Sequence, residues 1–302
     1  KIIYIMNVKI FKNKFSKYIE LEKKLAKFTW FGVGGNAEIL FVPENEETLS
    51  FFLKNKPKTY KVLAIGAGSN LIIRDKGIKG IVLVTKKLKN ISIDDNGIIS
   101  AQAGASDAEV ARFARDYERT GLEFLLGIPG TIGGGIKMNS GAFGSEFKDI
   151  LIDVTAINLS GEFRVFSMKE LGMEYRAIGI SDEWIFCKAR FKSASDNKKN
   201  IDSKMKQILR LRKTAQPTGV KTGGSTFKNP NGHKAWKLID QAGCRGLRVG
   251  DAIISEKHCN FIINLKNSSA QQIEELGEIV KSKVFETSGI RLNWEIQRVG
   301  MK

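Results

Sequence analysis

Cysteine and histidine are scarce in this chain of 302 residues, and their scarcity excludes several kinds of chemistry. The three cysteines, Cys187, Cys244 and Cys259, are far apart and form no C-x-x-C pair, so neither a disulfide framework nor a zinc site is expected. The two histidines lack the neighbouring acidic residues that metal hydrolysis or a Ser-His-Asp triad requires. We therefore expect no metal ion and a reduced, cytoplasmic protein.

Long apolar runs are also missing. No run approaches the roughly 18–20 residues that a membrane-spanning helix needs. The N-terminal segment KIIYIMNVKIF begins with a basic residue, but Asn7 and Lys9 interrupt the apolar core that a signal peptide requires. The chain does not begin with methionine, and Met6 is a candidate start. These features predict neither export nor a membrane segment.

Acidic residues are outnumbered, since 49 Lys and Arg stand against 32 Asp and Glu and give a formal net charge of +17. Such an excess fits nucleic-acid binding, because clustered cations release counterions from phosphates. Here the basic residues are scattered, without the interleaved aromatic residues typical of single-strand binders. The alternative is a lysine-rich solvated surface with a few cations directed at a phosphorylated small molecule. Charge alone does not decide between the two.

Glycine, in contrast, is concentrated in residues 127–144, GIPGTIGGGIKMNSGAFG. Large apolar side chains alternate with these glycines, whereas a flexible linker would be rich in serine and glycine. The pattern indicates a buried loop whose main-chain N–H groups closely approach a ligand. A second glycine turn, GAGSN at residues 66–70, is followed by LIIRD. It therefore predicts a strand-to-strand turn rather than the G-x-G-x-x-G turn that opens a helix in a Rossmann fold.

Apolar periodicity predicts a protein of mixed helices and strands, in two or three domains at this length. Strands are expected at residues 37–42, 62–65, 71–73, 81–84, 153–158, 184–191 and 261–265. Helices are expected to open at Pro43 and its following acids, at the S-x-x-E capping box of Ser106 and Glu109, and at residues 268–269, and a further helix is expected to run through Trp236 to a stop at Gly243. The polar stretch SASDNKKN, residues 193–200, is the best candidate for a linker.

Three further features are individually weak. Residues 222–230, TGGSTFKNP, present Ser225 and Asn229 on a turn, which is equally typical of a ligand site and of an ordinary surface turn. Arg176 follows a tyrosine in a segment where an arginine is usually solvated. Glu295 alternates with apolar neighbours in WEIQRV, so it either points inward from a strand or lines the polar face of one.

Together, six segments in this order resemble the UDP-N-acetylenolpyruvoylglucosamine reductase family: WFGVGGNAEILFVP, AIGAGSNLIIRDKGIKGIVL, GIPGTIGGGIKMNSGAFG, YR, GGSTFKNP and WEIQRVG. The resemblance covers nearly everything after about residue 28 and is to the shorter form of the family. It implies an α+β fold with a two-subdomain FAD-binding clasp similar to vanillyl-alcohol oxidase, plus a C-terminal α+β substrate-binding domain. The implied boundaries are an N-terminal lead-in at 1–27, an FAD-binding domain at 28–192 with subdomains at about 28–84 and 85–192, and a substrate-binding domain at 201–302.

The resemblance also implies an activity, the NADPH-dependent, FAD-mediated reduction of UDP-N-acetylglucosamine enolpyruvate to UDP-N-acetylmuramate for peptidoglycan. Arg176, Ser225 and Glu295 match the family's catalytic positions. Ser225 would supply a proton, while Arg176 and Glu295 would stabilise the enolate formed when hydride adds to the alkene. Because an ionised carboxylate would repel that enolate, we expect the pKa of Glu295 to be raised in the site. The implied partner is the UDP-sugar substrate, with no nucleic acid and no membrane, and the protein is expected to be a monomer or weak oligomer.

The family's binding positions match residues in and near both glycine segments. Those implied for FAD are Gly66, Gly68, Ser69, Asn70, Gly127, Gly130, Thr131, Gly133, Gly134, Gly135, Asn139, Ser140 and Gly141. Those implied for the UDP or carboxylate end of the substrate are Lys213 and Asn229. The chain departs from the family pattern at Lys137, Ser140 and Ile178, none of which is a catalytic position. The departures therefore concern the geometry of the glycine segment more than the activity.

Two other classes stay open on the sequence alone. A flavoprotein oxidase with the same clasp would share the FAD turns but not the set of Arg176, Ser225 and Glu295, and it would return its electrons to oxygen. A basic nucleic-acid-binding protein would carry no flavin and would show steeply salt-dependent binding of DNA or RNA.

Overall fold

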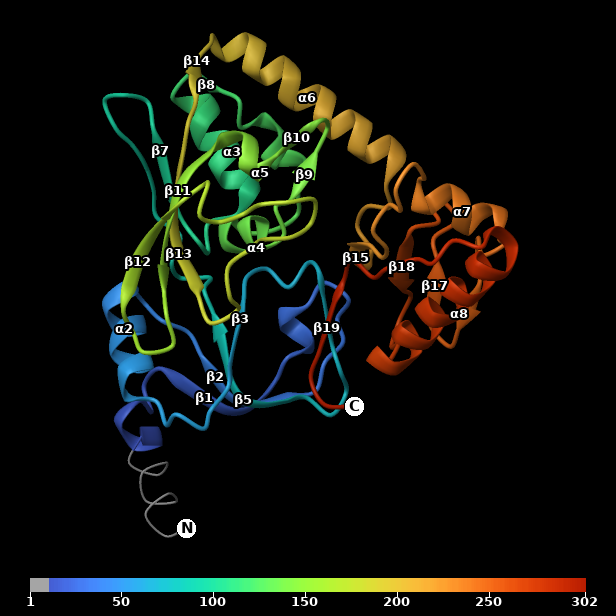
Figure 1. Cartoon of the computed structure of the whole chain (residues 1–302), viewed down its shortest axis with the longest axis horizontal. Helices are drawn as coiled ribbons and strands as arrows, with labels where there is room; N and C mark the ends of the chain where they lie inside the picture. The colour runs from blue at the N-terminus through green and yellow to red at the C-terminus, as the bar shows by residue number, and fades with distance from the viewer. Residues whose placement is uncertain (1–10) are drawn as a thin grey trace. The chain divides into compact units, whose positions relative to one another are not determined.

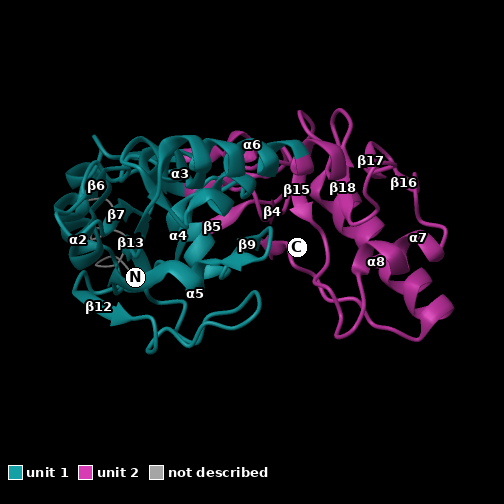
Figure 2. Cartoon of the chain, turned by 90° about the horizontal axis from the view of Figure 1, so that it is seen from above, with its two compact units in different colours: residues 1–21, 39–67, 80–210 teal, residues 22–38, 68–79, 211–302 magenta. Residues whose placement is uncertain are grey.

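The structure, a computed structural model, describes residues 11–302, and the candidate start Met6 lies outside the described residues. The chain forms two compact units, coloured separately in Figure 2. Unit 1 contains the residues up to 21 together with 39–67 and 80–210, and unit 2 contains residues 22–38, 68–79 and 211–302. Each unit thus combines segments that are far apart in the sequence. The predicted boundaries, which follow chain order, do not coincide with this division and remain a prediction.

The first sheet has the strand order β1, β2, β5, β3 (Figure 1), with bounds Ile19–Lys24, Asn36–Phe41, Ile78–Val84 and Val62–Ile65. β3 and β5 pair in parallel. Helix α2, Glu46–Asn55, connects β2 to β3. It begins after Asn45, whose side chain accepts a hydrogen bond from the Thr48 N–H, and not at Pro43 as predicted. Asparagine is a strong N-cap, and the two glutamates that follow it favour the positive end of the helix dipole.

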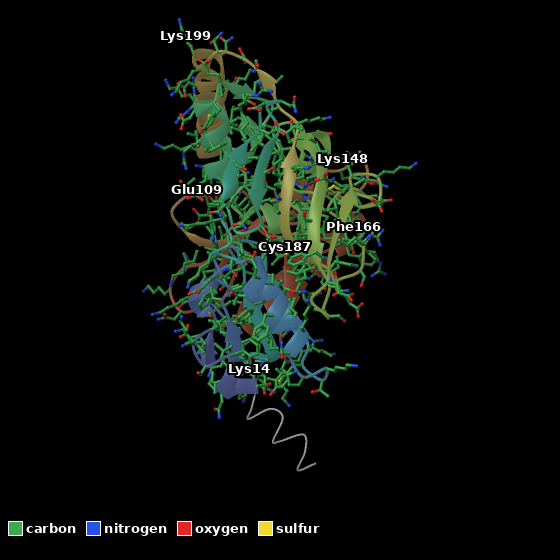
Figure 3. All side chains as sticks on the ribbon, turned by 90° about the vertical axis from the view of Figure 1, so that its left-hand side faces the viewer. Lys14, Glu109, Lys148, Phe166, Cys187 and Lys199 are labelled. Carbon is green, nitrogen blue, oxygen red and sulfur yellow. The ribbon has the colours of Figure 1, made fainter. Side chains whose placement is uncertain are left out.

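The second sheet is antiparallel and has the order β12, β11, β13, β7, β6, with bounds Phe163–Ser167, Leu151–Ile157, Ile185–Phe191, Ile99–Gln102 and Ile91–Ile93. The first half of its strand β13 is buried on both faces, because Phe186 belongs to one apolar cluster and Cys187 to another. Figure 3 labels Cys187 and, on β12, Phe166. Burial raises the pKa of the Cys187 thiol well above its ordinary value. This double burial explains the apolar run at residues 185–187, after which exposed Lys188 and Arg190 alternate with buried residues.

The helices of unit 1 that follow β7 share the larger apolar cluster with this sheet. They are α3 (Asp107–Asp116), the 3-10 helix η2 (Glu123–Gly127), α4 (Ile132–Lys137), α5 (Phe147–Ile150) and most of α6 (Lys198–Ala215). The capping box predicted for α3 is present, since Glu109 donates its N–H to Ser106 Oγ and accepts the Ser106 N–H, each at 3.1 Å. Among the described helices, none combines the length and the apolarity required to cross a lipid bilayer.

Unit 2 contains an antiparallel sheet of order β15, β18, β17, β16, with bounds Lys221–Ser225, Phe261–Asn264, Ala252–Ile254 and Arg248–Val249. The helices α7 (Ala235–Gln241) and α8 (Ala270–Ser288) bury apolar residues in the same cluster as this sheet. Ser269 caps α8 where the sequence predicts its start. The unit also holds the 3-10 helix η1 (Ala26–Phe28) and a parallel pair, β4 (Leu71–Ile73) with β19 (Gln297–Val299).

Residues 193–200 do not form the predicted linker. Strand β14, Ala194–Ser195, pairs with β8, Arg119–Thr120, and α6 begins at Lys198 within the same stretch. The Arg119 guanidinium donates to Ser193 Oγ at 2.8 Å, to the Ser193 carbonyl at 3.0 Å and to Ser195 Oγ at 2.7 Å. Residues 193–195 have the composition of a loop, but serine hydroxyls accept hydrogen bonds from protein donors as readily as from water. The Arg119 guanidinium therefore fixes this segment.

Candidate active site

The first glycine turn joins β3 directly to β4, with no helix after it, as the sequence predicts. Gly68 has a φ of +65°, and a Cβ at this position would overlap the Phe28 carbonyl, so only glycine fits. From Gly66 to Asn70, no main-chain N–H donates a hydrogen bond to an acceptor in the described part of the chain. Closely spaced N–H groups of this kind bind phosphate oxygens.

Thr131 places a buried hydroxyl beside this turn. A Cβ at Gly66 would overlap Thr131 Oγ1, so the glycine and the threonine are in close contact within unit 1. Thr131 is 7% exposed, and its Oγ1 has no hydrogen-bond partner among the residues that the structure describes. A buried hydroxyl without a partner costs about 1–3 kcal/mol, which a ligand oxygen at this position would remove. The open N–H groups of the turn and the Thr131 hydroxyl are each donors suited to a phosphate oxygen, and their assignment to FAD remains a prediction.

The second glycine segment was predicted to be a loop. This prediction is wrong for residues 132–137, which form helix α4. Packing explains two of its glycines. A Cβ at Gly133 would lie 2.9 Å from Ala103 Cβ, and one at Gly135 would overlap the Phe147 ring. At Gly134 the position of a Cβ has only one described atom within 4 Å, at 3.7 Å, apart from its chain neighbours and the backbone of its own helix. Gly134 is thus the helical glycine that leaves room for a ligand, whereas its neighbours allow the helix to pack tightly.

The residues that flank α4 are fixed by main-chain contacts. Gly130 accepts the Asp107 N–H through its carbonyl at 3.2 Å, and Ser140 donates its N–H to the Gly135 carbonyl at 2.8 Å. After them, β9 (Gly141–Ala142) and β10 (Ser145–Glu146) form a hairpin whose two turn residues have φ values of +54° and +87°. A turn with positive φ at both positions matches the twist of paired strands. The assignment of these residues to FAD remains a prediction.

Arg176 lies in a two-residue turn of unit 1. The flanking residues Glu174 and Ala177 form an antiparallel bridge, with N–H to carbonyl distances of 3.1 and 3.2 Å. Arg176 has a φ of +55°, in the left-handed region that few residues other than glycine adopt. Its guanidinium donates to the carbonyls of Asn139, at 3.3 Å, and Gly141, at 3.4 Å. The predicted catalytic arginine is therefore in contact with the second glycine segment.

Ser225 and Glu295 come together in unit 2. Ser225 ends β15, and the carbonyl of the next residue, Thr226, accepts the Glu295 N–H at 2.9 Å. Glu295 itself lies before the strand on which it was predicted, since β19 begins at Gln297. The side chain of Asn70 donates to the Glu295 carbonyl at 3.2 Å and links the first glycine turn to this segment. Two of the three predicted catalytic residues thus belong to unit 2, and the arginine belongs to unit 1.

The two predicted substrate residues, Asn229 and Lys213, differ in their surroundings. Asn229 Oδ1 accepts the N–H of Ala235, the first residue of α7, at 3.0 Å. Lys213, in the last turn of α6, has an exposed side chain, while its carbonyl accepts a hydrogen bond from Lys257 Nζ at 2.5 Å. Their assignment to substrate remains a prediction.

Asp107 is a buried residue beside the glycine segment that the sequence prediction missed. It is completely buried, and neither carboxylate oxygen has a hydrogen-bond partner in the described part of the chain. Burial raises the pKa of Asp107 well above its ordinary value. A signal was available, because Asp107 is spaced three, four and seven residues from Val110, Ala111 and Ala114 on the buried face of α3.

Two family models match the chain. Residues 37–167 match an FAD binding domain, and residues 216–299 match the C-terminal domain of UDP-N-acetylenolpyruvoylglucosamine reductase. The UDP-N-acetylenolpyruvoylglucosamine reductases of Rickettsia bellii (strain RML369-C) and Bradyrhizobium sp. (strain ORS 278) are 46% and 48% identical to it over 296 and 282 residues. These alignments cover 98% and 93% of this chain and 97% and 92% of the two relatives.

A solved structure agrees with the sequence relatives. The crystal structure of UDP-N-acetylenolpyruvylglucosamine reductase from Thermus caldophilus is similar to this one with a TM-score of 0.81 and 34% sequence identity, over 93% of this chain and 99% of that one. The predicted α+β fold, with its FAD-binding clasp and C-terminal substrate-binding domain, is confirmed. The chain therefore belongs to the UDP-N-acetylenolpyruvoylglucosamine reductase family of FAD-dependent oxidoreductases.

Proposed function

We propose that the chain performs the reaction for which its relatives are named, the NADPH-dependent reduction of UDP-N-acetylglucosamine enolpyruvate to UDP-N-acetylmuramate in peptidoglycan precursor synthesis. When bound, FAD supplies the hydride chemistry between NADPH and the alkene of the substrate. The residues that would hold its diphosphate are the open N–H groups of residues 66–70 and the Thr131 hydroxyl. The single observation that carries the proposal is that the similarity to a reductase of this family extends over 98% of the chain.

Arg176 binds the carboxylate of the enolpyruvyl group in this proposal. Addition of hydride to the terminal alkene carbon leaves negative charge on the neighbouring carbon and on that carboxylate. A guanidinium presents parallel N–H donors that match a carboxylate, and it keeps its positive charge throughout the reaction. The left-handed backbone of Arg176 supports a functional role, because strained conformations persist where the surrounding structure holds them and cluster at active sites.

Ser225 donates the proton that completes the reduction. A serine hydroxyl is a weak acid, so it serves only where the carbanion is strongly basic and the hydroxyl is held close to it. Ser225 is half-buried at the end of β15, which gives its backbone a fixed direction. Glu295, held one residue away by the hydrogen bond to Thr226, acts in its protonated form as a donor to the enolate.

The enzyme is proposed to work in the cytoplasm as a monomer or weak oligomer, with the UDP-sugar as its partner. NADPH and sugar nucleotides are metabolites of that compartment, and the three cysteines are free and buried, as in a reduced protein. The excess of positive charge is assigned to the attraction of phosphorylated ligands.

The test is an anaerobic absorption experiment on the purified holoprotein. NADPH should bleach the yellow flavin colour, and subsequent addition of UDP-N-acetylglucosamine enolpyruvate should restore it. Ser225→Ala should bleach normally but recover its colour about 10²- to 10⁴-fold more slowly, the range for loss of a general acid. Glu295→Ala, which removes the donor, should slow recovery about 10²- to 10³-fold, the range for loss of one donor to an oxyanion.

Ser282→Ala and Glu286→Ala, at exposed positions of α8, are matched controls and should behave like the parent protein. Recovery of colour with oxygen but not with the enolpyruvyl sugar nucleotide would keep the FAD fold and exclude the proposed substrate. A colourless protein that FAD does not reconstitute would contradict the assignment of the glycine turns.

A further inference from the structure

Asn139 has its hydrogen-bonding groups engaged within the protein. The residue is fully buried and has a φ of +38°. Its side-chain amide donates to Glu146 Oε2 and to the Glu174 carbonyl, both at 3.0 Å. Its side-chain oxygen accepts the Lys148 N–H, and its own N–H donates to the Ile136 carbonyl, also at 3.0 Å each. Each N–H of Asn139 thus has a protein acceptor, so the residue has no free donor for FAD.

These bonds lead to the turn that carries Arg176. Glu174 and Ala177 form the base of that turn, and the carbonyl that accepts the Asn139 amide also accepts the Ala177 N–H. At the other side, the Arg176 guanidinium donates to the Asn139 main-chain carbonyl. Asn139 therefore contacts the turn twice, once at its base through the side chain and once at the arginine through the backbone.

The remaining partners fix Asn139 itself. Glu146 ends the short hairpin after the glycine segment, and Lys148 lies on α5 and projects its side chain outward in Figure 3. Glu146 also pairs with Lys148 Nζ at 2.5 Å. The amide is thus held between two short elements that follow it in the chain, and its second N–H is directed at the arginine turn. The side chain of Asn139 therefore connects the glycine segment to the arginine turn by hydrogen bonds.

We propose that Asn139 is a positioning residue for Arg176: it transmits the fixed geometry of the glycine segment to the arginine turn and so aligns the guanidinium with the substrate carboxylate. The inference rests on the proposed role of Arg176. A turn with a left-handed arginine needs external support to keep one conformation, and a displacement of about 1 Å in a substrate-binding group lowers rates about 100-fold. A further side-chain contact of the glycine segment, from Lys137 Nζ to Asp182 at 2.5 Å, ends on an aspartate that is 93% exposed and contributes little.

The test compares Asn139→Gly, Asn139→Asp, Arg176→Ala and the double variant Asn139→Gly/Arg176→Ala. Glycine tolerates the positive φ and removes the side-chain bonds, while aspartate keeps the shape and loses the two N–H donors. Urea midpoints of both variants show whether an effect reflects only a loss of folding, because the aspartate also faces the Glu146 carboxylate. Lys137→Ala is the matched control, because it removes the exposed tie alone.

Four quantities are measured for each variant: FAD content, the rate of flavin reduction by NADPH, the rate of reoxidation by the enolpyruvyl sugar nucleotide, and the Kd of the product UDP-N-acetylmuramate from the change in the flavin spectrum. Both Asn139 variants should retain FAD and be reduced by NADPH within about threefold of the parent. Reoxidation should be about 10- to 100-fold slower, and product should bind about tenfold more weakly. In the Arg176→Ala background, Asn139→Gly should add less than about twofold.

Three outcomes would overturn the inference. Loss of FAD, or equal slowing of both half-reactions, would make Asn139 part of the flavin site. Full additivity of Asn139→Gly and Arg176→Ala would show that Asn139 does not act through the arginine. Normal reoxidation and product binding by Arg176→Ala would contradict the proposed function of the arginine itself, which is distinguishable because the single Arg176 variant reports it alone.

Discussion

Gly66 and Thr131 meet so closely that a methyl group at position 66 would overlap the threonine hydroxyl. We predict that Gly66→Ala lowers the free energy of unfolding by about 1–3 kcal/mol, the usual cost of overpacking. Thr131→Ala should weaken FAD binding about tenfold, because it removes one hydrogen bond to a charged group. In the double variant the closest remaining atom is Thr131 Cβ, at 3.4 Å, so stability should recover while FAD affinity should not.

Urea unfolding of the apoprotein and titration with FAD measure the two effects separately. If the double variant regained FAD affinity together with stability, the hydroxyl would have no role in binding.

Asp107 predicts a pH dependence of opposite sign to that of most carboxylates. Burial raises its folded-state pKa well above the ordinary value of 3.8. Between the unfolded and folded pKa values the unfolded chain loses a proton that the folded protein keeps, so the free energy of unfolding falls as pH rises, by up to about 1.4 kcal/mol per pH unit. Asp107→Asn removes the titrating carboxyl group and with it this fall in the free energy of unfolding. We predict that the variant is more stable than the parent at about pH 8 and that the difference is smallest near pH 4.

Glu109, on the same helix turn, is the matched comparison. Hydrogen bonds from Ser106 hold the pKa of Glu109 below its ordinary value, so its stabilisation is present above the unfolded-state pKa and is lost as pH falls through the folded-state pKa. Glu109→Gln should therefore destabilise the protein at about pH 8 and have little effect at low pH. Urea midpoints of both variants and the parent at about pH 8 and pH 4 measure these differences in stability. A loss of stability in Asp107→Asn that does not depend on pH would mean that the carboxylate has a hydrogen-bond partner.

Among the helices and strands, sequence patterns correctly predicted those whose position depends on interactions between residues close together in the chain. The strand at residues 62–65, the capping boxes of α3 and the start of α8 after Ser269 are where the patterns place them, because caps and apolar periodicity act within a few residues. Helix α4 was missed, since three of its six residues are glycines with low helix propensity. Contacts with Ala103 and Phe147, distant in sequence, favour the helix there, and no local pattern reports them.

The fixed segment at residues 193–195 gives a prediction at this scale. Arg119 provides three of its hydrogen bonds, so Arg119→Ala should release the segment without unfolding the sheet. We expect limited trypsin digestion to cut near Lys192 and Lys198 at least about tenfold faster in the variant, because local opening governs such cleavage. Arg112→Ala, an exposed arginine of α3, removes the same charge and should leave the digestion unchanged. Equal cleavage of both variants and the parent would show that the segment is held by other contacts.

For the whole molecule, the division into two units could not be read from the sequence. Segments 22–38 and 68–79 belong with the C-terminal part through contacts such as the parallel pairing of β4 with β19, which joins positions more than 220 residues apart. The polar stretch at residues 193–200 was the strongest local boundary signal, yet contacts rather than composition decide which segments pack together. The three proposed catalytic positions were predicted from the resemblance to the family, because a lone serine, arginine or glutamate carries no signal of its own.

The net charge of +17 is a property of the whole molecule, and its role is testable through salt. The proposed substrate carries a diphosphate and a carboxylate, so a positive field should raise its rate of encounter. We predict that kcat/KM for the enolpyruvyl sugar nucleotide falls several-fold between about 20 and 300 mM KCl, because the Debye length shortens from about 20 to about 6 Å over that range. The kcat at saturating substrate should change little, since it does not depend on encounter, and sucrose at matched osmolarity should leave both constants unaffected. If kcat/KM were independent of salt, the charge would act on solubility alone, and substrate capture would depend only on groups at the site itself.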